Sequence, residues 1–343
     1  MGQSDGSTQP PDLLIWILTG KCNLACSHCY ASRFRSLREL SLAEALKVLR
    51  DAWEAGVEYV SFTGGEPLLH PPLFRLLEEA YDLGVGVSIV SNGSTISRET
   101  ARRLSTLEVH VYLSVDGSRV SHEKLRGNGT WKYVAEAAAH LKDEDVSYST
   151  ITVLARETLR HLGEAVEFAR RFDAEEACII PVIPSGKASA SMLPPAEEAL
   201  KGILSFVEAC NLAGIPAEVW CAPYMRLYVE PSKAAVYRCR TDHVADMDVE
   251  GNLLLCDVLD FRLANVRREG FAKAWETYLQ HPFHQEVGKP VESEPCSSCP
   301  VRSKCMGGCY ARALLVEGSL RQPDPLCPRV EAFRKGELQP TTL

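Results

Sequence analysis

The sequence lacks the features of membrane-spanning, exported and nucleic-acid-binding proteins. None of its apolar runs approaches the roughly 20 residues that a membrane-spanning helix needs, and the opening "MGQSDGSTQPPD" contains no hydrophobic export segment. Acidic side chains outnumber basic ones and give the 343 residues a formal net charge of -8, whereas contacts with phosphate need clustered Lys and Arg. We therefore expect a cytoplasmic protein that has neither a membrane nor a nucleic acid as its partner.

Cysteine, by contrast, is abundant, with 13 in the chain. The count is odd and no export signal precedes it, so a reducing compartment and metal or redox chemistry are favoured over disulfide bonds. Three of these residues, Cys22, Cys26 and Cys29, lie within the ten residues "KCNLACSHCY", directly after a predicted strand.

Strand-like and helix-like segments alternate over the first half of the chain. The apolar, β-branched segments predict strands at 13–20, 57–65, 85–93, 109–117, 146–154 and 175–183. The segments between them predict helices at 41–56, 71–84, about 97–108, 130–145 and about 160–172. The first of these helices has the capping pattern of Ser41 followed by Glu44. This alternation indicates an α/β fold with a parallel sheet, either a partial six-unit barrel or an open doubly wound sheet.

The later part of the chain has a different composition. The segment "PSGKASASMLPP" marks a boundary, a helix is expected at about 196–213, and cysteines become frequent from about residue 236. The predicted units are a tail at 1–11, an α/β domain at 12–185, a bridging region at 186–235, a cysteine-rich domain at 236–331 and a tail at 332–343.

The first three cysteines occupy a position where chemistry is expected. In parallel α/β sheets and barrels, functional residues collect at the carboxyl ends of the strands. Three thiolates at this spacing can hold a [4Fe–4S] cluster with one open iron, while a zinc site would need a fourth ligand, which His28 could supply. The cysteines alone leave both alternatives open.

Three further motifs end the next three predicted strands: "TGGEP" at 63–67, "SNG" at 91–93 and "LSVDG" at 113–117. Glycines let a backbone approach a ligand closely. Glu66 could accept hydrogen bonds from an ammonium group, and Ser91, Asn92 and Ser114 could contact a carboxylate or a ribose. Together these motifs predict a binding site for a small molecule.

The strings "CNLACSHCY" and "TGGEP" resemble the motifs of the radical S-adenosylmethionine (SAM) family, over about residues 12–185. The resemblance implies a partial (β/α)6 TIM-like barrel in which Cys22, Cys26 and Cys29 hold a catalytic [4Fe–4S] cluster. SAM would bind the fourth iron, and its reductive cleavage would yield a 5′-deoxyadenosyl radical that abstracts a substrate hydrogen.

The same resemblance assigns residues around SAM. Gly64, Gly65 and Glu66 would meet its ammonium group, and Tyr30 would lie near its adenine. The residues expected on the carboxylate and ribose side are Ser91, Asn92 and Ser114. Asp116 and Arg126 are further candidates for cofactor contacts, with the alternative that they are a turn residue before Gly117 and a solvated arginine.

The C-terminal cysteines follow a second pattern, which resembles the SPASM domain, the auxiliary-cluster module of radical SAM enzymes. The resemblance implies one auxiliary [4Fe–4S] cluster held by Cys296, Cys299, Cys305 and Cys327, and part of a second held by Cys239, Cys256 and Cys309. Cys221 lies 18 residues before Cys239. Either it is the missing ligand of the second cluster, or that cluster has an open iron.

The remaining cysteines and histidines have simpler interpretations. Cys178 and Cys210 are expected to be small buried hydrophobic residues. His28 is expected to pack around the cluster and His70 to be a loop residue, while His122 could approach the substrate.

The substrate is the least determined feature. The strings "IPSGKA", "CAPYMR" and "CMGGCYARALLVEGSLRQPDPLCP" resemble segments of enzymes that alter tetrapyrrole side chains, and the cluster motif begins too early in the chain for the leader-binding domain common in peptide-modifying relatives. We therefore expect an oxidoreductase with three [4Fe–4S] clusters that acts on a small cofactor precursor such as a porphyrin propionate. A ferredoxin or flavodoxin would supply its electrons.

Two alternatives stay open at this stage. One is modification of a peptide or protein, through a thioether, a C–C crosslink or formylglycine. The other is a non-catalytic iron–sulfur electron carrier, which would leave "TGGEP" and "SNG" without a role.

Overall fold

The computed structural model describes residues 9–239 and 241–338. Residues 1–8 of the predicted N-terminal tail and 339–343 of the predicted C-terminal tail therefore lie outside the described part of the chain. Among the residues that the structure describes, no helix is both long enough and apolar enough to cross a membrane.

Six parallel strands form the centre of the fold and neighbour one another in the order of the chain. They are β1 (Leu13–Thr19), β2 (Tyr59–Gly64), β3 (Gly86–Ser91), β4 (His110–Ser114), β5 (Tyr148–Leu154) and β6 (Glu176–Pro181). A doubly wound sheet would reverse its strand order at a switch point. The sequential order therefore confirms the partial barrel and excludes the doubly wound alternative.

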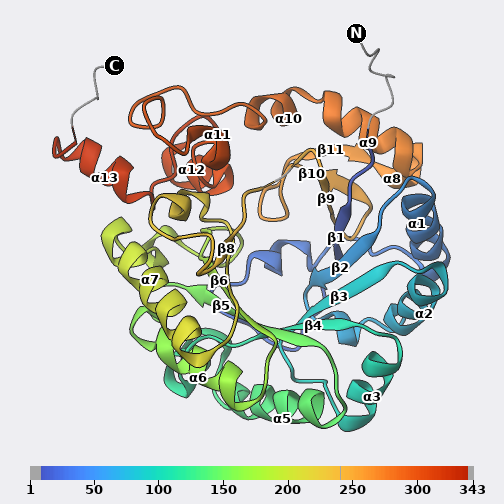
Figure 1. Cartoon of the computed structure of the whole chain (residues 1–343). Coiled ribbons are helices and arrows are strands. Elements are labelled where there is room, and N and C mark those ends of the chain that lie inside the picture. The colour runs from blue at the N-terminus through green and yellow to red at the C-terminus, as the bar shows by residue number, and fades with distance from the viewer. Residues whose placement is uncertain (1–8, 240, 339–343) are drawn as a thin grey trace.

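Helices cover the outside of this sheet and form the rim of the molecule (Figure 1). They are α1 (Leu42–Glu54), α2 (Leu73–Leu83), α3 (Arg98–Thr106), α5 (Thr130–Asp143), α6 (Leu162–Arg171) and α7 (Ala196–Ala213). The predicted capping box is present at α1, where Ser41 and Glu44 bond each other's backbone amides. Short 3-10 turns complete this part: η1 (Tyr30–Phe34), η2 (Pro67–Leu69), η3 (Leu159–His161), η4 (Ala190–Met192) and η5 (Pro223–Leu227).

One helix within the barrel was not expected from the sequence. Helix α4 (Arg119–Arg126) follows β4 and is capped by Ser118, whose side chain accepts a hydrogen bond from the amide of Ser121. Its residues are mostly polar, so an apolar helical period is hardly visible in "RVSHEKLR". This helix matters because it carries both His122 and Arg126.

The sheet continues beyond both edges of the barrel and has 11 strands in all among the described residues. Beyond β6 it adds β7 (Ala217–Val219) and β8 (Ala235–Val236). Beyond β1 it adds β9 (Val244–Met247), which is parallel to β1, and the antiparallel β10 (Asn252–Leu254) and β11 (Arg262–Asn265). Segments on both sides of the predicted boundaries at 185 and 236 thus share one sheet.

The C-terminal helices lie across the open side of the barrel, where Figure 1 shows them in orange to red between α1 and α7. They are α8 (Val266–Glu269), α9 (Phe271–Gln280), α10 (Pro282–Val287), α11 (Arg302–Cys305), α12 (Tyr310–Glu317) and α13 (Pro328–Arg334). This arrangement brings the cysteine-rich region next to the carboxyl-terminal part of the barrel.

The two faces of the sheet differ in burial. On the outer face, Trp16 and Phe62 are fully buried and their ring centroids are 5.6 Å apart. Side chains that alternate with such residues point to the other face, and among them Ser61, Tyr112 and Ile151 are only half-buried. The inner face of the sheet is therefore less completely buried at these three positions than the outer face is at Trp16 and Phe62.

Candidate active site and metal centres

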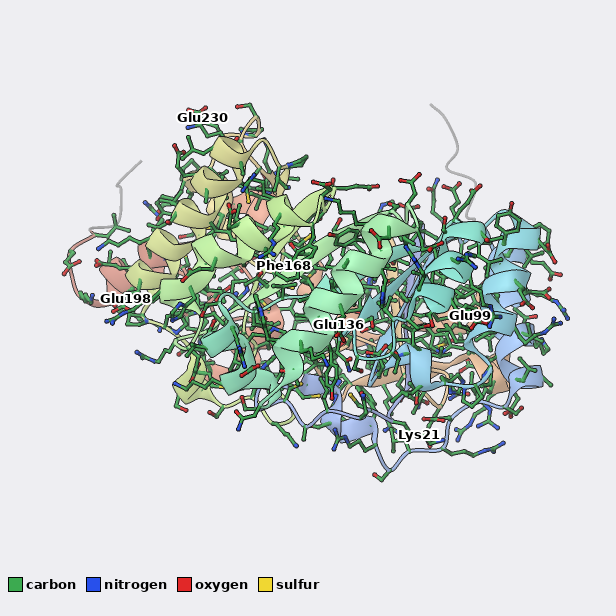
Figure 2. The ribbon with its side chains drawn as sticks, turned by 90° about the horizontal axis from the view of Figure 1, so that it is seen from below. Lys21, Glu99, Glu136, Phe168, Glu198 and Glu230 are labelled. Carbon is green, nitrogen blue, oxygen red and sulfur yellow. The ribbon has the colours of Figure 1, made fainter. Side chains whose placement is uncertain are left out.

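The loop after β1 carries Cys22, Cys26 and Cys29 at one end of the barrel. Lys21 directly precedes Cys22, and Figure 2 shows it at the opposite end of the molecule from Glu230. Cys26 is buried, whereas Cys22 and Cys29 are half-buried, so the loop can present thiols to a bound group. The amide of Leu24 donates to Sγ of Cys22 at 3.4 Å, a contact that stabilises a thiolate ligand.

Two glycines hold this loop against the end of β2. The amide of Gly65 donates to the carbonyl of Thr19 at 2.7 Å. A Cβ atom on Gly64 would collide with the carbonyl oxygen of Thr19, and one on Gly65 with that of Lys21. The "GG" of "TGGEP" is therefore required by contact with the cysteine loop itself, a reason that the sequence analysis did not identify.

Replacement of Gly65 by alanine is expected to displace the Lys21 backbone and the cysteine loop, and to lower the free energy of unfolding by about 1–3 kcal/mol. Chemical denaturation of the iron-loaded protein measures this effect. The matched control is Gly163→Ala on α6, where a Cβ would meet nothing within 4 Å and the change should be neutral or stabilising by up to about 1 kcal/mol. Equal stability of the two variants would contradict the close contact.

Glu66 joins the ends of β2 and β3. Its carboxylate is fully buried and accepts hydrogen bonds from Ser91 Oγ at 2.9 Å, the Asn92 amide at 2.8 Å and the Leu68 amide at 3.3 Å. Burial raises the pKa of Glu66 to about 7, although these donors oppose the rise. The predicted contact with the SAM ammonium group stays a prediction, and the structure adds a positioning role for the same carboxylate.

Asn92 extends this network to the cysteine loop. Its side-chain Nδ2 lies 3.7 Å from Sγ of Cys22 and 3.2 Å from Oδ1 of Asn23. Tyr30, at the start of η1, places its hydroxyl 3.4 Å from Oγ1 of Thr63. Ser114 is buried at the last residue of β4. The polar residues predicted at the strand ends therefore lie at the same edge of the sheet as the cysteines.

Asp116 and Arg126 form a buried ion pair, with 2.6 Å between Oδ2 and Nε. The Arg126 side chain is only 10% exposed, so the alternative of a solvated arginine is wrong. The second oxygen of Asp116 accepts a hydrogen bond from the Val153 amide at 2.9 Å. Burial alone would raise the pKa of Asp116, but the charge of Arg126 lowers it to about 2.

The side chains of the three histidines considered in the sequence analysis are largely buried. His28 places Nε2 3.7 Å from Asp116 and is 9% exposed, which matches the expected packing role. His122 is fully buried and its Nδ1 accepts the Asp116 amide at 3.2 Å, so it supports this loop. His70 is buried at the end of η2, 3.6 Å from Glu39.

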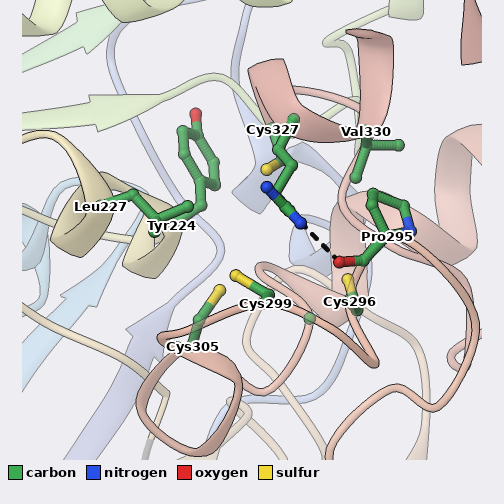
Figure 3. Close-up of a pocket in the computed structure, with 10 residues that line it drawn as sticks. Tyr224, Leu227, Pro295, Cys296, Cys299, Cys305, Cys327 and Val330 are labelled. Carbon is green, nitrogen blue, oxygen red and sulfur yellow. Dashed lines mark hydrogen bonds between the residues drawn. The ribbon is translucent and has the colours of Figure 1, made fainter. Parts of the chain in front are cut away.

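Four C-terminal cysteines line one cavity, and we call them the Cys296 group: Cys296, Cys299, Cys305 and Cys327. Figure 3 shows their thiols around this space, with Tyr224, Leu227 and Val330 at its wall. Burial raises the pKa of Cys305 and that of Cys327 to about 12. A hydrogen bond from the Gly307 amide to Cys305 and one from the Val330 amide to Cys327 oppose this rise. Such amide donors favour the thiolate form.

A second set lies nearby, and we call it the Cys221 group: Cys221, Cys239, Cys256 and Cys309. A hydrogen bond between the thiols of Cys221 and Cys239 lowers the pKa of Cys221 and raises that of Cys239, while Cys309 and Cys256 act on Cys239 by charge. Cys239 is exposed, Cys221 half-buried, and Cys256 and Cys309 buried. The fold therefore brings Cys221 to three cysteines, whereas the sequence left open whether it joins them.

The two remaining cysteines are fully buried. Cys210 packs in the main hydrophobic core, as expected. Cys178 also donates its thiol to Oε2 of Glu218 at 3.4 Å, so its surroundings are more polar than the apolar strand suggested. Neither residue belongs to the cysteine groups.

Several charged residues near the cysteines, some half-buried and some fully buried, were missed by sequence reasoning. Asp257 follows Cys256 directly, and its backbone oxygen accepts a hydrogen bond from Arg33. Burial raises the pKa of both Asp257 and Asp246. Arg312 and Asp324 form a further ion pair in the C-terminal region. No spacing motif marks these residues, because their partners come from distant segments.

Comparison with known proteins agrees with this geometry. Residues 16–169 match the profile of the Radical SAM superfamily. The chain is similar to the AdoMet-dependent heme synthase of Oleidesulfovibrio alaskensis, at 26% identity over 92% of this chain and 86% of that protein. It is also similar to the mycofactocin maturase MftC of Mycobacterium tuberculosis, at 27% identity over 95% of this chain and 85% of that protein.

Among solved structures, Streptococcus suis SuiB bound to S-adenosylmethionine has the same fold, with a TM-score of 0.74 and 18% identity over 93% of this chain and 75% of that chain. SuiB has also been solved with its precursor peptide SuiA. Residues 16–169 therefore form a radical SAM domain.

Proposed function

We propose that Cys22, Cys26 and Cys29 hold a [4Fe–4S] cluster whose open iron binds SAM. The observation that carries this proposal is the convergence of the first three strand ends, joined by hydrogen bonds, on the loop with these three cysteines. The residues present fit such a cluster, since the thiols are partly accessible and amide donors lie at Sγ of Cys22. When bound, the cluster and SAM would supply the radical that removes a substrate hydrogen.

The chain's own residues would orient SAM in this site. Gly64, Gly65 and Glu66 would bind its ammonium group, and Tyr30 would lie beside its adenine. The residues proposed for the carboxylate and ribose side are Ser91, Asn92 and Ser114. The buried Asp116–Arg126 pair would support the cofactor site in two ways. It would place charge beside the loop, and Asp116 would hold the end of β5 through the Val153 amide.

We propose two auxiliary [4Fe–4S] clusters, one in the Cys296 group and one in the Cys221 group. The cavity of the Cys296 group supports the first assignment, because four thiols face one enclosed space. The hydrogen bond between Cys221 and Cys239 supports the second. Cys221 also has a left-handed backbone with φ of 52°, a strained conformation for a residue with a side chain and one that is often retained at functional sites.

Replacement of Cys221 by alanine is expected to change one auxiliary cluster and leave the other two intact. The reason is that removal of one thiolate leaves an iron without its protein ligand. Iron analysis and electron paramagnetic resonance of the reduced protein measure the loss. The matched control is Cys210→Ala, at a residue of α7 that packs in the hydrophobic core, and this variant should keep all clusters. A Cys221 variant with the iron content and spectrum of the wild type would overturn this assignment.

We propose a small cofactor precursor with propionate side chains, of the tetrapyrrole class, as substrate. The similarity to the heme synthase supports this class. Of the three strings that resemble tetrapyrrole enzymes, 183–188 packs against the cysteine loop, where the Lys187 amide donates to the Cys29 carbonyl at 3.0 Å. The other two strings, 221–226 and 305–328, contribute residues to the cysteine groups. Their resemblance to tetrapyrrole enzymes therefore also reflects residues that would bind the auxiliary clusters.

Peptide modification is the second candidate. The equally similar mycofactocin maturase and the SuiB structure with its precursor peptide favour it. The third alternative, a non-catalytic electron carrier, does not fit a radical SAM enzyme. A ferredoxin or flavodoxin as electron donor and a cytoplasmic location remain part of the proposal, supported by the redox cofactors and the 13 cysteines.

Deuterium transfer separates the two substrate classes. The anaerobically reconstituted enzyme would be given SAM, a reductant and iron coproporphyrin deuterated on its propionate side chains. Deuterium in the released 5′-deoxyadenosine is the expected result. SAM cleavage without deuterium transfer would reject the tetrapyrrole class, and a peptide encoded beside the gene would then be tested in the same assay.

A further inference from the structure

Arg312 and Asp324 form a fully buried ion pair in the C-terminal region. Both side chains are 0% exposed, and Arg312 donates to the carboxylate through Nε at 2.9 Å and Nη2 at 2.7 Å. A buried pair of this kind is costly to form and often replaceable by apolar residues without loss of stability. Its presence here calls for a role besides stability.

The pair lies between the two cysteine groups and contacts both. On the side of the Cys221 group, Asp324 accepts the Cys309 amide at 2.9 Å and Arg312 Nη2 donates to the Cys221 carbonyl at 2.8 Å. On the side of the Cys296 group, the Asp324 carbonyl accepts the Cys327 amide at 3.0 Å. The ion pair therefore holds cysteines of both groups at a fixed separation.

Arg312 itself contacts two cysteines of the Cys221 group. Its own amide donates to Sγ of Cys309 at 3.4 Å. Together with the bond from Nη2 to the Cys221 carbonyl, this contact places the backbone amide and the guanidinium of Arg312 against two cysteines of the group.

Two buried donors at this point have no partner among the described residues: Nη1 of Arg312 and the hydroxyl of Tyr224. The Tyr224 ring lines the cavity of the Cys296 group, but its hydroxyl points away from Cys299 and Cys305 (Figure 3). Tyr224 lies in η5, three residues after Cys221, so its backbone is held close to the Cys221 group. A buried donor without an acceptor destabilises the folded protein, and the cost is greater when the donor is charged.

We propose that Arg312 Nη1 and the Tyr224 hydroxyl donate hydrogen bonds to sulfur atoms of the auxiliary cluster in the Cys221 group, and thereby raise its reduction potential. Hydrogen bonds to cluster sulfurs and a nearby positive charge stabilise the more negative, reduced state. Arg312 and Tyr224 are positioning residues in this role, and Asp324 fixes the guanidinium. The inference rests on the proposed auxiliary clusters.

The location of the Cys221 group suits a cluster with a raised reduction potential. Asp257, next to Cys256, hydrogen-bonds Tyr30 of the cysteine loop and contacts Arg33 through its backbone. The Cys221 group is thus connected to the SAM site by direct contacts. A cluster of raised potential here would be the first acceptor for an electron that leaves the substrate.

Redox titration of the reconstituted enzyme, followed by electron paramagnetic resonance, tests the inference with Tyr224→Phe and Arg312→Lys. The first variant removes one hydroxyl, and the second keeps the charge but loses the planar fork. Each should retain wild-type iron while the midpoint potential of one auxiliary cluster moves to more negative values. The matched controls are Tyr133→Phe and Arg334→Lys, at residues that are 44% and 46% exposed, and they should shift nothing.

The presence of the auxiliary clusters and the hydrogen bonds to one of them are overturned by different results. Wild-type protein with only about four irons per chain would overturn the auxiliary clusters themselves. Wild-type protein and Tyr224→Phe with full iron and identical potentials would overturn this inference alone. Because loss of a phenolic hydroxyl is a mild change, the Tyr224 variant decides the question even if the Arg312 variant does not fold.

Discussion

A variant in which Cys22, Cys26 and Cys29 are all replaced by alanine is expected to release no detectable 5′-deoxyadenosine from SAM in the presence of dithionite. It should still bind about eight irons per chain, against about twelve in the wild type. The reason is that these three residues lie in one loop, while the Cys221 and Cys296 groups are built from residues 221–327. Chromatography of the products and iron analysis of the same sample measure both parts.

The loop itself should keep its place in this variant. It is anchored by the Ser27 amide on the Leu125 carbonyl at 2.8 Å and by Arg35 Nη2 on the Leu24 carbonyl at 2.7 Å, and neither contact involves a thiol. Cys210→Ala serves as control for the loss of a cysteine elsewhere and should retain cleavage. Continued cleavage of SAM by the triple variant would contradict the assignment of the first cluster.

Replacement of Asp116 by alanine is expected to lower the free energy of unfolding by about 3–5 kcal/mol, because it leaves the buried Arg126 charge without its partner. It also removes the acceptor of the Val153 amide, so the ends of β4 and β5 lose a connection. Denaturant unfolding under anaerobic conditions, at matched iron content, measures the difference.

The matched control is Asp143→Asn, which breaks the ion pair with Arg98. Both of those side chains are more than half exposed, and exposed pairs contribute about 0–1 kcal/mol. An Asp116 variant as stable as the Asp143 variant would mean that Arg126 finds another acceptor or water. Asp116→Asn should fall between the two, since its amide oxygen can still accept one hydrogen bond.

The periodicity of the sequence predicted the central sheet because each of its six strands is a mostly apolar, β-branched segment followed by a helix. Strands β7 to β11 have only two to four residues, too few for a pattern to emerge. The pairing of β9 with β1 joins residues more than 200 positions apart, which no local signal can indicate. Helix α4 was missed because its polar residues show little helical period.

The candidate site was predictable where function needs a residue at a fixed offset from its neighbours. Such offsets relate the cysteines of the loop after β1, the residues of "TGGEP" and the Cys296 group. The roles of the glycines, the burial of the Asp116–Arg126 pair and the supporting position of His122 were not predictable. They depend on which segments meet at the ends of the strands.

Local spacing was enough to predict an α/β protein with a radical SAM motif and two sets of C-terminal cysteines. Which thiols share a space, the place of Cys221 beside Cys239 and the burial of Arg312 with Asp324 between the two groups became visible with the folded chain. The physical reason is that a charge or thiol acquires its role from its neighbours in space, and folding chooses those neighbours by burying surfaces that are far apart in the chain.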